Sequence, residues 1–216
     1  MKRIKDGYLE KIQTVLSFTG KKALEVGCGD GSRTVQIASC CADVIAIDPS
    51  PVSLAKARSE RTRPNIEYHE GSADHLSFAD TSFDIVFFTL SFHHVPVEQM
   101  GITLNEALRV LKNDGFVIFL EPAFDGSFFD AEITFDACDG DERKEKAFAY
   151  GAMLAHQQMQ EIKELADETI FEFESVEDYK QSMNPKKGTT EQLVSFLASR
   201  NFTLTAQRRI NIFRKK

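Results

Sequence analysis

The chain has 216 residues, of which 42% are hydrophobic, so it can bury a sizeable core. A length of this order favours one domain with an insertion or cap over two independent units. The net charge of −7 and the pI near 5.3 argue against a protein that binds by neutralising phosphates, and we expect no nucleic-acid partner.

Neither a secretory leader nor a membrane span is expected. The basic run Met1–Lys5 is not followed by the apolar segment of a signal peptide, and no stretch reaches the roughly 18 apolar residues of a membrane span. The cysteines lack the C-x-x-C spacing of a zinc site and are poorly placed for a disulfide framework. We therefore predict a cytoplasmic protein with reduced thiols at Cys28, Cys40, Cys41 and Cys138.

Five short runs of β-branched and aromatic residues predict β-strands. They recur at intervals of about twenty to thirty residues with helical patterns between them, which is typical of βαβ units. The predicted fold class is α/β: a Rossmann-like, doubly wound, mostly parallel sheet in the order 3-2-1-4-5, followed by C-terminal strands. The five runs are Ala23–Val26, Val44–Ile47, Ile66–His69, Phe83–Thr89 and Phe116–Leu120.

Helical patterns occupy the intervals between these strands. An opening helix is predicted over Tyr8–Phe18. Ser50 can cap a helix whose first residue is Pro51, where a missing N–H costs nothing. A helix with an apolar stripe precedes the fifth strand, and Asn113–Gly115 turns the chain into that strand. The stripe consists of Met100, Leu104, Ala107, Leu108 and Leu111.

From Pro122 onward the pattern changes, with phenylalanines set among acidic residues. A long helix is predicted there from a stripe at helical spacing, namely Phe148, Gly151, Ala152, Ala155, Met159, Ile162 and Ala166. A short apolar stretch at Ile170–Phe173, a helix through Glu191–Ser199 and a strand region over Phe202–Phe213 follow. Within one domain we thus expect an N-terminal helix (1–20), a ligand-binding core (21–122), a mainly helical cap (123–190) and a C-terminal helix and strand region (191–216).

The segment Leu24–Ser32 is the most informative, because three glycines fall where the first strand ends and a helix begins. Glycine tolerates positive φ and lets a ligand approach the backbone, and a helix N-terminus presents free N–H groups. In open α/β sheets, ligands bind at the carboxyl ends of the strands, beside the point where the strand order reverses. The segment is therefore predicted to form a ligand site.

Two common nucleotide-binding loops are disfavoured at this place. A dinucleotide fingerprint that starts at Gly27 needs glycine or alanine at position 32, which is Ser32, and the third glycine is Gly31 instead. A Walker A loop fails because no G-K-[ST] follows. Asp48 ends the second strand, where its carboxylate can accept both hydroxyls of a ribose. These observations narrow the ligand to an adenosine-type nucleoside.

Taken together, the motifs resemble the class I S-adenosylmethionine-dependent methyltransferases, in particular the small-molecule group that includes quinone- and sterol-modifying enzymes. The resemblance covers residues 20–122 and is carried, in order, by Glu25–Gly31, Asp48, Gly71–Asp74, Phe83–Phe87 and Leu111–Phe116. It implies an enzyme that binds S-adenosylmethionine, transfers its methyl group to a small organic acceptor and releases S-adenosylhomocysteine.

The resemblance also implies the cofactor-binding residues. The loop glycines would approach the methionyl part of the cofactor, and Glu25 would order the loop or contact the amino group. Asp74 would hydrogen-bond the adenine amine, with a backbone N–H of Ala73 nearby. The alternatives are a purely conformational role of the glycines, a helix cap at Asp48 and an exposed loop carboxylate at Asp74. The expected set is Glu25, Gly27, Cys28, Gly29, Gly31, Asp48, Pro49, Ala73, Asp74 and Thr89.

The acceptor end is predicted at Ser91–Val95, which follows the fourth strand across the crevice from the glycine loop. The cofactor's methyl group is electrophilic, so the enzyme chiefly has to position a nucleophile, and a base is needed where the acceptor loses a proton. Histidine is the usual base near neutral pH. We predict His94, and less directly His93, as a general base or acceptor-orienting group, with a capping or packing role as the alternative.

Residues 122–190 and the N-terminal helix have no place in the minimal sheet and are predicted to cover the acceptor pocket. The 18 phenylalanines would make that pocket apolar and aromatic, although plain packing of the cap is the alternative. The acidic residues among them are predicted to form a solvated face, and no metal site is expected.

Two other classes compete with an enzyme that transfers methyl groups. One is a cofactor-binding sensor or a catalytically silent, methyltransferase-like partner protein, which the cofactor motifs alone cannot distinguish from the enzyme. The other is a nicotinamide oxidoreductase, which Ser32 disfavours. We expect a monomer or a homodimer.

Overall fold

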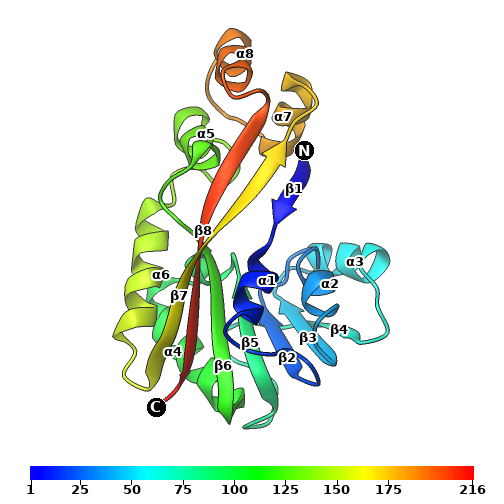
Figure 1. The fold of residues 1–216 in the computed structure, drawn as a ribbon, viewed down its shortest axis with the longest axis vertical. Coiled ribbons are helices and arrows are strands. Elements are labelled where there is room, and N and C mark those ends of the chain that lie inside the picture. The colour runs from blue at the N-terminus through cyan, green and yellow to red at the C-terminus, as the bar shows by residue number, and fades with distance from the viewer.

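Five adjacent parallel strands make up one side of an eight-stranded sheet, as far as its edge at β4, in the computed structural model, which describes residues 1–216 (Figure 1). The strand order is β1-β7-β8-β6-β5-β2-β3-β4, and β1, β7 and β8 pair antiparallel. Counted from β2 as the first, the parallel strands stand in the order 3-2-1-4-5. The strands are β1 (Lys2–Asp6), β2 (Lys22–Val26), β3 (Asp43–Asp48), β4 (Ile66–Glu70), β5 (Phe83–Thr89), β6 (Leu111–Pro122), β7 (Met159–Glu172) and β8 (Thr203–Lys215).

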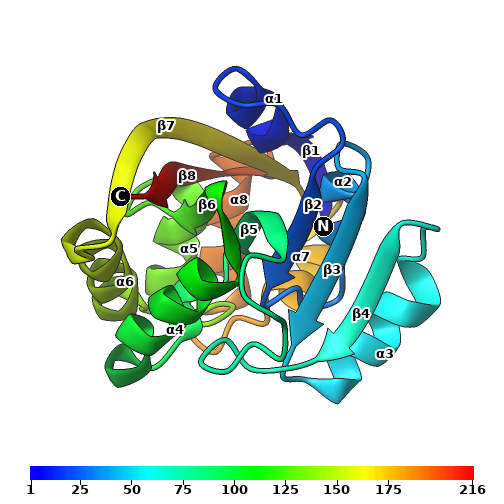
Figure 2. The same ribbon diagram turned by 90° about the horizontal axis from the view of Figure 1, so that it is seen from below.

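Helices cover both faces of this sheet, and the predicted α/β class is confirmed (Figure 2). Helices α4 and α6 pack on one face, and α1 and α2 pack on the other. None of the helices is long and apolar enough to span a membrane. They are α1 (Tyr8–Gln13), α2 (Thr34–Ile37), α3 (Pro51–Glu60), α4 (Val97–Val110), α5 (Ser127–Phe135), α6 (Arg143–Ala155), α7 (Val176–Met183) and α8 (Thr190–Ala198), with a 3-10 helix, η1, at Phe92–His94.

The parallel strands are apolar runs because both of their faces are buried. Successive side chains of a strand point to opposite faces. In β5, Ile85 and Phe87 pack in the cluster with α1 and α2, whereas Val86 and Phe88 pack in the cluster with α4 and α6. A strand in this position needs a hydrophobic residue at nearly every place, which is the pattern that the sequence shows.

Capping residues and apolar stripes in the sequence predicted several helices correctly. The hydroxyl of Ser50 accepts a hydrogen bond from the Ser53 amide and caps α3, and Pro51 is its first residue. The predicted stripe of α4 is buried from Met100 to Leu108. The predicted turn at Asn113–Gly115 is wrong, because β6 begins at Leu111, directly after α4, and a register shift opposite β5 takes up the irregularity. The opening helix ends at Gln13.

The long helix predicted through Ala166 is wrong beyond Ala155. Residues 159–172 form strand β7, which pairs with β8 along its length. The alternation that marks a strand is present from 165 to 171, but two of its buried residues are polar, Asp167 and Thr169. Asp167 is paired with Lys11 of α1 at 3.0 Å. A hydrophobicity pattern cannot reveal buried positions that are filled by a charged residue and a threonine.

The cap is built on the far ends of β7 and β8, which extend beyond the rest of the sheet (Figure 1). Helices α5, α7 and α8 surround these ends, and their side chains form a separate hydrophobic cluster with them. The cap is therefore not purely helical, because it shares its longest strands with the core sheet. Strand β1 pairs with the cap half of β7 and joins the N-terminus to it.

The cluster of the cap depends on Phe135, which is 3% exposed and packs edge-on against Tyr179 and Phe196. We expect Phe135→Ala to lower the free energy of unfolding by about 3–5 kcal/mol, because it removes a buried ring and leaves a cavity. The matched control is Phe148→Ala in α6, where the ring is 56% exposed and the change should stay within about 0.5 kcal/mol. Urea denaturation of both variants measures the difference, and equal losses would contradict this account of the cap.

Candidate functional site

The glycine loop follows β2 at the carboxyl edge of the sheet. The amides of Gly27 and Cys28 both donate to the Ile47 carbonyl of β3, which fixes the loop to the neighbouring strand. Gly27 has a φ of +76°, and a Cβ there would lie 2.5 Å from Cβ of Ser91. At Gly29 the φ is +54°, and a Cβ would meet nothing within 4 Å. Gly27 is therefore required by packing, whereas Gly29 leaves open space beside the backbone.

Asp48 joins the end of β3 to this loop. Its Oδ2 accepts from the Gly29 amide at 2.7 Å, and its Oδ1 accepts from the Ser50 amide at 2.9 Å. Each carboxylate oxygen can accept a further hydrogen bond. The carboxylate lines the cavity described below, so it can accept from a pair of ligand hydroxyls while the protein holds it in place.

Glu25 lies beneath the loop and is fully buried in β2. It accepts hydrogen bonds from the hydroxyls of Thr34, at 2.6 Å, and Thr89. Burial raises the pKa of Glu25 to about 7, although these two hydrogen bonds act in the opposite direction. Glu25 does not line the cavity, so in this structure it orders the loop and its neighbours.

One cavity of about 370 Å³ brings six of the predicted site residues together: Gly27, Cys28, Gly29, Asp48, Thr89 and His94. The rest of its lining consists of Arg3, Asp30, Ser32, Arg33, Leu90 and Ser91. Cys28 and Leu90 are its only hydrophobic members. The cavity thus contains both the predicted cofactor end and the predicted acceptor end.

The other predicted residues lie outside this lining. A Cβ at Gly31 would lie 2.5 Å from the hydroxyl of Tyr68, so this glycine serves packing. Pro49 is exposed, and Ala73 is half-buried. The carboxylate of Asp74 accepts a hydrogen bond from the Ser72 hydroxyl within its own loop. The adenine contacts of Ala73 and Asp74 stay predictions.

His93 is buried in η1, between two carboxylates. Its Nδ1 is hydrogen-bonded to Glu121 at the end of β6, and Glu121 also accepts from the amides of Ser91 and Phe92. Its Nε2 lies 3.7 Å from the carboxylate of Glu142. Burial alone would lower the pKa of His93, but the charge of Glu121 and the hydrogen bond to it prevail and raise that pKa.

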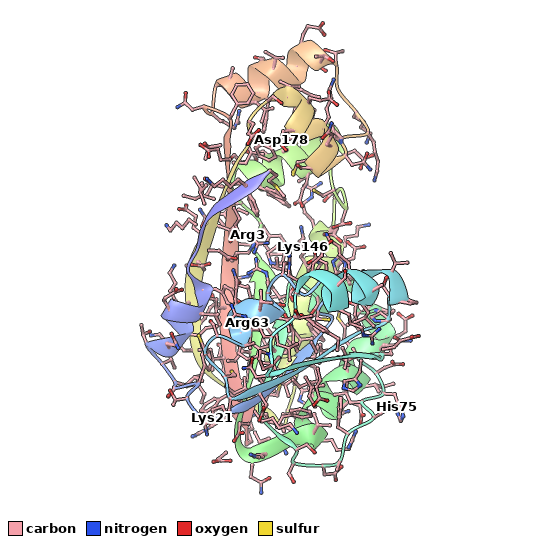
Figure 3. All side chains as sticks on the ribbon, turned by 90° about the vertical axis from the view of Figure 1, so that its right-hand side faces the viewer. Arg3, Lys21, Arg63, His75, Lys146 and Asp178 are labelled. Atoms are coloured by element: carbon pink, nitrogen blue, oxygen red, sulfur yellow. The ribbon has the colours of Figure 1, made fainter.

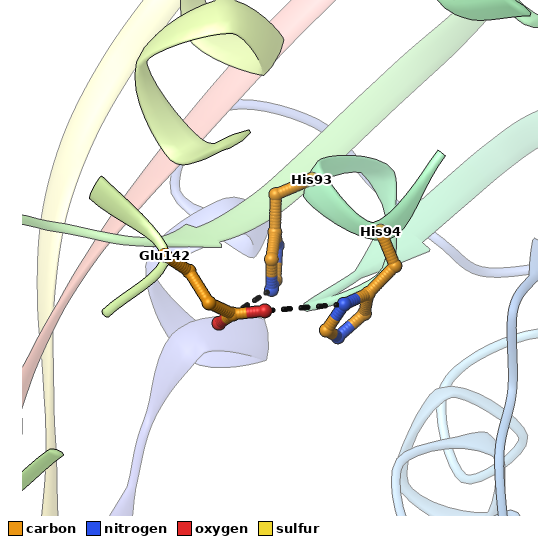
Figure 4. A group of neighbouring side chains, drawn as sticks. All are labelled: His93, His94 and Glu142. Atoms are coloured by element: carbon orange, nitrogen blue, oxygen red, sulfur yellow. Dashed lines mark ion pairs between the residues drawn. The ribbon is translucent and has the colours of Figure 1, made fainter. Parts of the chain in front are cut away.

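His94 lines the cavity, and its side chain is half exposed. Its Nδ1 lies 3.4 Å from Glu142, whose carboxylate points toward both imidazoles in Figure 4. The pKa of His94 is lowered, first by burial and then by the positive charge of His93, whose ring centroid is 4.1 Å away. His94 is therefore unprotonated at neutral pH and can act as a base at the cavity.

The same three side chains bring together donors of a kind that binds divalent metal ions. The ligand atoms of His93, His94 and Glu142 lie within 4.8 Å of one another. We expected no metal from the sequence, because it has no compact cluster of histidine or aspartate residues with ligand spacing; Glu142 is far along the chain from the histidines. The ammonium group of Lys146 lies 3.5 Å from Glu142, so this carboxylate has a cationic partner within the protein.

The phenylalanines expected to line the acceptor pocket lie elsewhere. Phe128 and Phe135 are buried in the cluster of the cap. The ring of Phe124 stacks under Arg209, and that of Phe129 lies beside Lys146. The cavity itself is lined mostly by polar residues. The alternative role of these phenylalanines, packing of the cap, is the one that the structure favours.

Sequence reasoning missed several residues of the site. Arg33 lies only two positions after the last glycine of the loop, so this closeness in the sequence could have marked it as a site residue. Arg3, Glu121 and Glu142 come from β1, from the end of β6 and from the residue before α6. No local pattern marks these three, because only the tertiary fold brings Arg3 to the cavity and the two glutamates to the histidines.

Comparison with known proteins identifies the family of this region. Residues 24–119 match the family described as "Methyltransferase domain". They are a methyltransferase domain. The resemblance to the S-adenosylmethionine-dependent methyltransferases is thereby confirmed, and S-adenosylmethionine is the cofactor of that class.

The similarity to curated proteins covers about half of the chain. Over 110 residues the chain is 36% identical to a demethylmenaquinone methyltransferase of Renibacterium salmoninarum, a segment that covers 51% of this chain and 45% of that protein. The matched segment spans about half the length of the curated relatives or less.

Solved structures match nearly the whole chain and show its fold. A putative methyltransferase from Bacillus halodurans superposes with a TM-score of 0.65 at 19% identity, covering 95% of this chain and 97% of that one. The [4+2]-cyclase SpnF superposes with a TM-score of 0.58 at 18% identity, covering 96% and 79%. Since a protein named a cyclase has this fold too, the fold alone does not fix the reaction.

The close approach at Gly27 can be tested by adding a methyl group. Gly20 provides the control, because its φ of +73° is nearly that of Gly27 and a Cβ there would meet nothing within 4 Å. Both alanine variants should lose about 1–2 kcal/mol because of the positive φ. Gly27→Ala should lose about 1–3 kcal/mol more, because its Cβ overlaps Ser91. Chemical denaturation measures both losses, and the idea fails if Gly27→Ala is no worse than Gly20→Ala.

Proposed function

We propose that this chain transfers the methyl group of S-adenosylmethionine to a small organic acceptor. The observation that carries the proposal is that the glycine loop, Asp48 and His94 line one cavity at the carboxyl edge of the sheet. The nucleoside-binding groups and a base are therefore within reach of a single bound ligand pair. Localisation in the cytoplasm and a monomer or homodimer belong to the same proposal.

The residues present fit the cofactor. The open space at Gly29 lets a ligand approach the backbone, and the Asp48 carboxylate can accept from the two hydroxyls of a ribose. Arg33 lines the same cavity, and its Nη2 is buried without a hydrogen-bond partner in the protein. Gly27, Cys28 and Thr89 complete the wall that the cofactor would contact.

When bound, S-adenosylmethionine supplies a methyl group whose bond to the sulfonium breaks as its bond to the acceptor forms, leaving S-adenosylhomocysteine. His94 takes the proton that a hydroxyl, enol or acidic carbon of the acceptor would lose. Glu142 lies beside Nδ1 of His94 and can orient the imidazole, so that Nε2 is left to act as the base. Glu121 is a positioning residue, because it holds His93 rather than the reacting groups.

The chemical class of the acceptor is inferred from the residues that line the cavity, not from the amino-acid composition of the cap. We expected an apolar or aromatic acceptor from the phenylalanines, but Arg3, Arg33, Ser91 and His94 face the cavity instead. This lining favours an acceptor that carries polar groups. The likeness of about half of the chain to a demethylmenaquinone methyltransferase supports methylation of a small molecule and leaves the acceptor open.

Binding separates the proposal from its competitors. The protein should bind S-adenosylmethionine and S-adenosylhomocysteine in calorimetry, and Asp48→Asn should weaken both about tenfold or more, because a charged acceptor is lost. The control is Asp43→Asn at the exposed start of the same strand, which should change nothing. A methyl-release assay over a panel of acceptors then decides between enzyme and sensor. Absence of binding would sink the proposal, and binding without transfer would favour the sensor.

Replacing the proposed base should affect turnover rather than cofactor affinity. We expect His94→Ala to lower kcat about ten- to a thousandfold, with the dissociation constant of S-adenosylhomocysteine nearly unchanged. Because the pKa of His94 is lowered, the wild-type rate should fall only as the pH drops below 6.5. The control is His69→Ala, since His69 is equally exposed and lies 3.3 Å from Glu67, but outside the cavity. Unchanged turnover in His94→Ala would remove the role.

A further inference from the structure

The guanidinium of Arg33 is buried without enough acceptors. Only 6% of its side chain is exposed, and it stacks over the ring of Tyr8. Nη1 donates to both oxygens of Asp6 at 3.2 Å. Nη2 is buried and has no hydrogen-bond partner. A buried charged donor that is left unpaired lowers the stability of the folded protein by about 1–3 kcal/mol or more, so a hydrogen-bond acceptor beside this nitrogen would be favourable.

The one carboxylate that forms an ion pair with Arg33 is shared with a second arginine. Arg3 of β1 donates to Asp6 at 2.9 Å, and the amide of Gln36 donates to the same oxygen at 3.3 Å. Arg3 and Arg33 both line the cavity. Two guanidinium groups therefore face one negative charge, and the excess of positive charge lies at the cavity wall.

A third arginine adds to this excess. Arg208 of β8 is 8% exposed, makes no ion pair and has a buried Nε without a partner. Burial, followed by repulsion from Arg33, lowers the pKa of Arg208 to about 10. Arg208 lies opposite Pro122 at the carboxyl end of β6, at the same edge of the sheet as the glycine loop.

These charges gather where the cap meets the core. In Figure 3, Arg3 and Lys146 lie at the level between the cap, marked by Asp178, and the far end of the core, marked by Lys21 and His75. Lys146 has two ion-pair partners, Glu132 and Glu142, at 3.5 Å from each. The three arginines have only Asp6 as an ion-pair partner, although the charge of Glu132 also acts on Arg208. Among the cationic groups of this region, the arginines are therefore the ones that lack ion-pair partners.

We propose that Arg33, supported by Arg3 and Arg208, binds the carboxylate of a ligand in this cavity. A guanidinium can donate two parallel hydrogen bonds to a carboxylate, and such charge-assisted pairs are stronger than neutral ones. The carboxylate has two possible sources, the amino-acid end of the cofactor or an acidic group of the acceptor. The inference rests on the proposed function for the identity of the first source.

Two nucleosides distinguish these sources by direct binding. S-adenosylhomocysteine carries the amino-acid carboxylate, whereas 5′-methylthioadenosine has the same adenosine and a thioether but no carboxylate. If Arg33 binds the cofactor, Arg33→Gln should weaken S-adenosylhomocysteine about ten- to a hundredfold and leave 5′-methylthioadenosine unchanged in calorimetry. The control is Arg214→Gln, an exposed arginine that donates to Gln160 at the other end of β8 and should change neither affinity.

The acceptor is represented by a second pair of probes, 4-hydroxybenzoate and its neutral isostere 4-hydroxybenzamide. If the acceptor supplies the carboxylate, the complex with S-adenosylhomocysteine should bind the benzoate more tightly than the amide, and Arg33→Gln should abolish that preference. Arg33→Lys keeps a charge for Asp6 and serves where the glutamine variant does not fold. It should weaken the same ligand by a smaller factor, because an ammonium group lacks the planar fork.

Three outcomes are decisive. Loss of affinity for a carboxylate-bearing probe alone, in the variants of Arg33, supports the site and identifies the source. Unchanged affinities for all four probes, or equal losses for probes with and without a carboxylate in a folded variant, overturn it. If the wild-type protein binds neither nucleoside, the proposed function fails instead, and the benzoate pair, measured without nucleoside, decides the arginine site by itself.

Discussion

A single carboxylate without access to solvent holds the binding edge of this sheet together. Glu25 lies in the central strand β2 and accepts hydrogen bonds from Thr34 at the start of α2 and from Thr89 at the end of β5. Burying an isolated carboxylate costs several kcal/mol, and the two hydroxyls and the charge of nearby Arg33 offset only part of this cost, since the pKa of Glu25 stays raised to about 7. The glycine loop, the start of α2 and the strand that leads to the histidines are thereby fixed relative to one another.

The antiparallel pair of strands β7 and β8 imposes the second constraint on the structure. Its core half pairs with β6 through β8, while its far half carries the cluster of the cap, so the cap cannot move as a detached domain without bending both strands. Glu142 reaches the site by another route. It precedes α6, whose residues Ala149 and Met153 pack with α4 in the main core. The acid beside the histidines is thus set by the packing of the core.

The part of the site that could be predicted is the part encoded locally. A glycine loop after a strand and an acid at the end of the next strand are close in the sequence, and backbone geometry alone brings Gly29 and Asp48 into hydrogen-bond contact. Glu142 and Arg3 gave no signal, because their place depends on how α6 and β1 pack. Strand β7 was predicted as a helix because one of its buried positions holds a charged residue, Asp167, which is paired with Lys11. A hydrophobicity pattern assigns such a residue to the solvent-facing side.

The ionisation of the two histidines follows from where the carboxylates lie. Two imidazoles whose ring centroids lie 4.1 Å apart repel each other when both are charged, so protonation of one disfavours protonation of the other. Of the two histidines only His93 is hydrogen-bonded to Glu121, and this asymmetry raises the pKa of His93, whereas the pKa of His94 is lowered. Glu142 lies near both rings, at 3.7 Å from Nε2 of His93 and 3.4 Å from Nδ1 of His94. When His94 takes a proton, the same carboxylate offsets the repulsion between the two imidazolium ions, so the charge produced by the proposed reaction meets a counter-charge already in position.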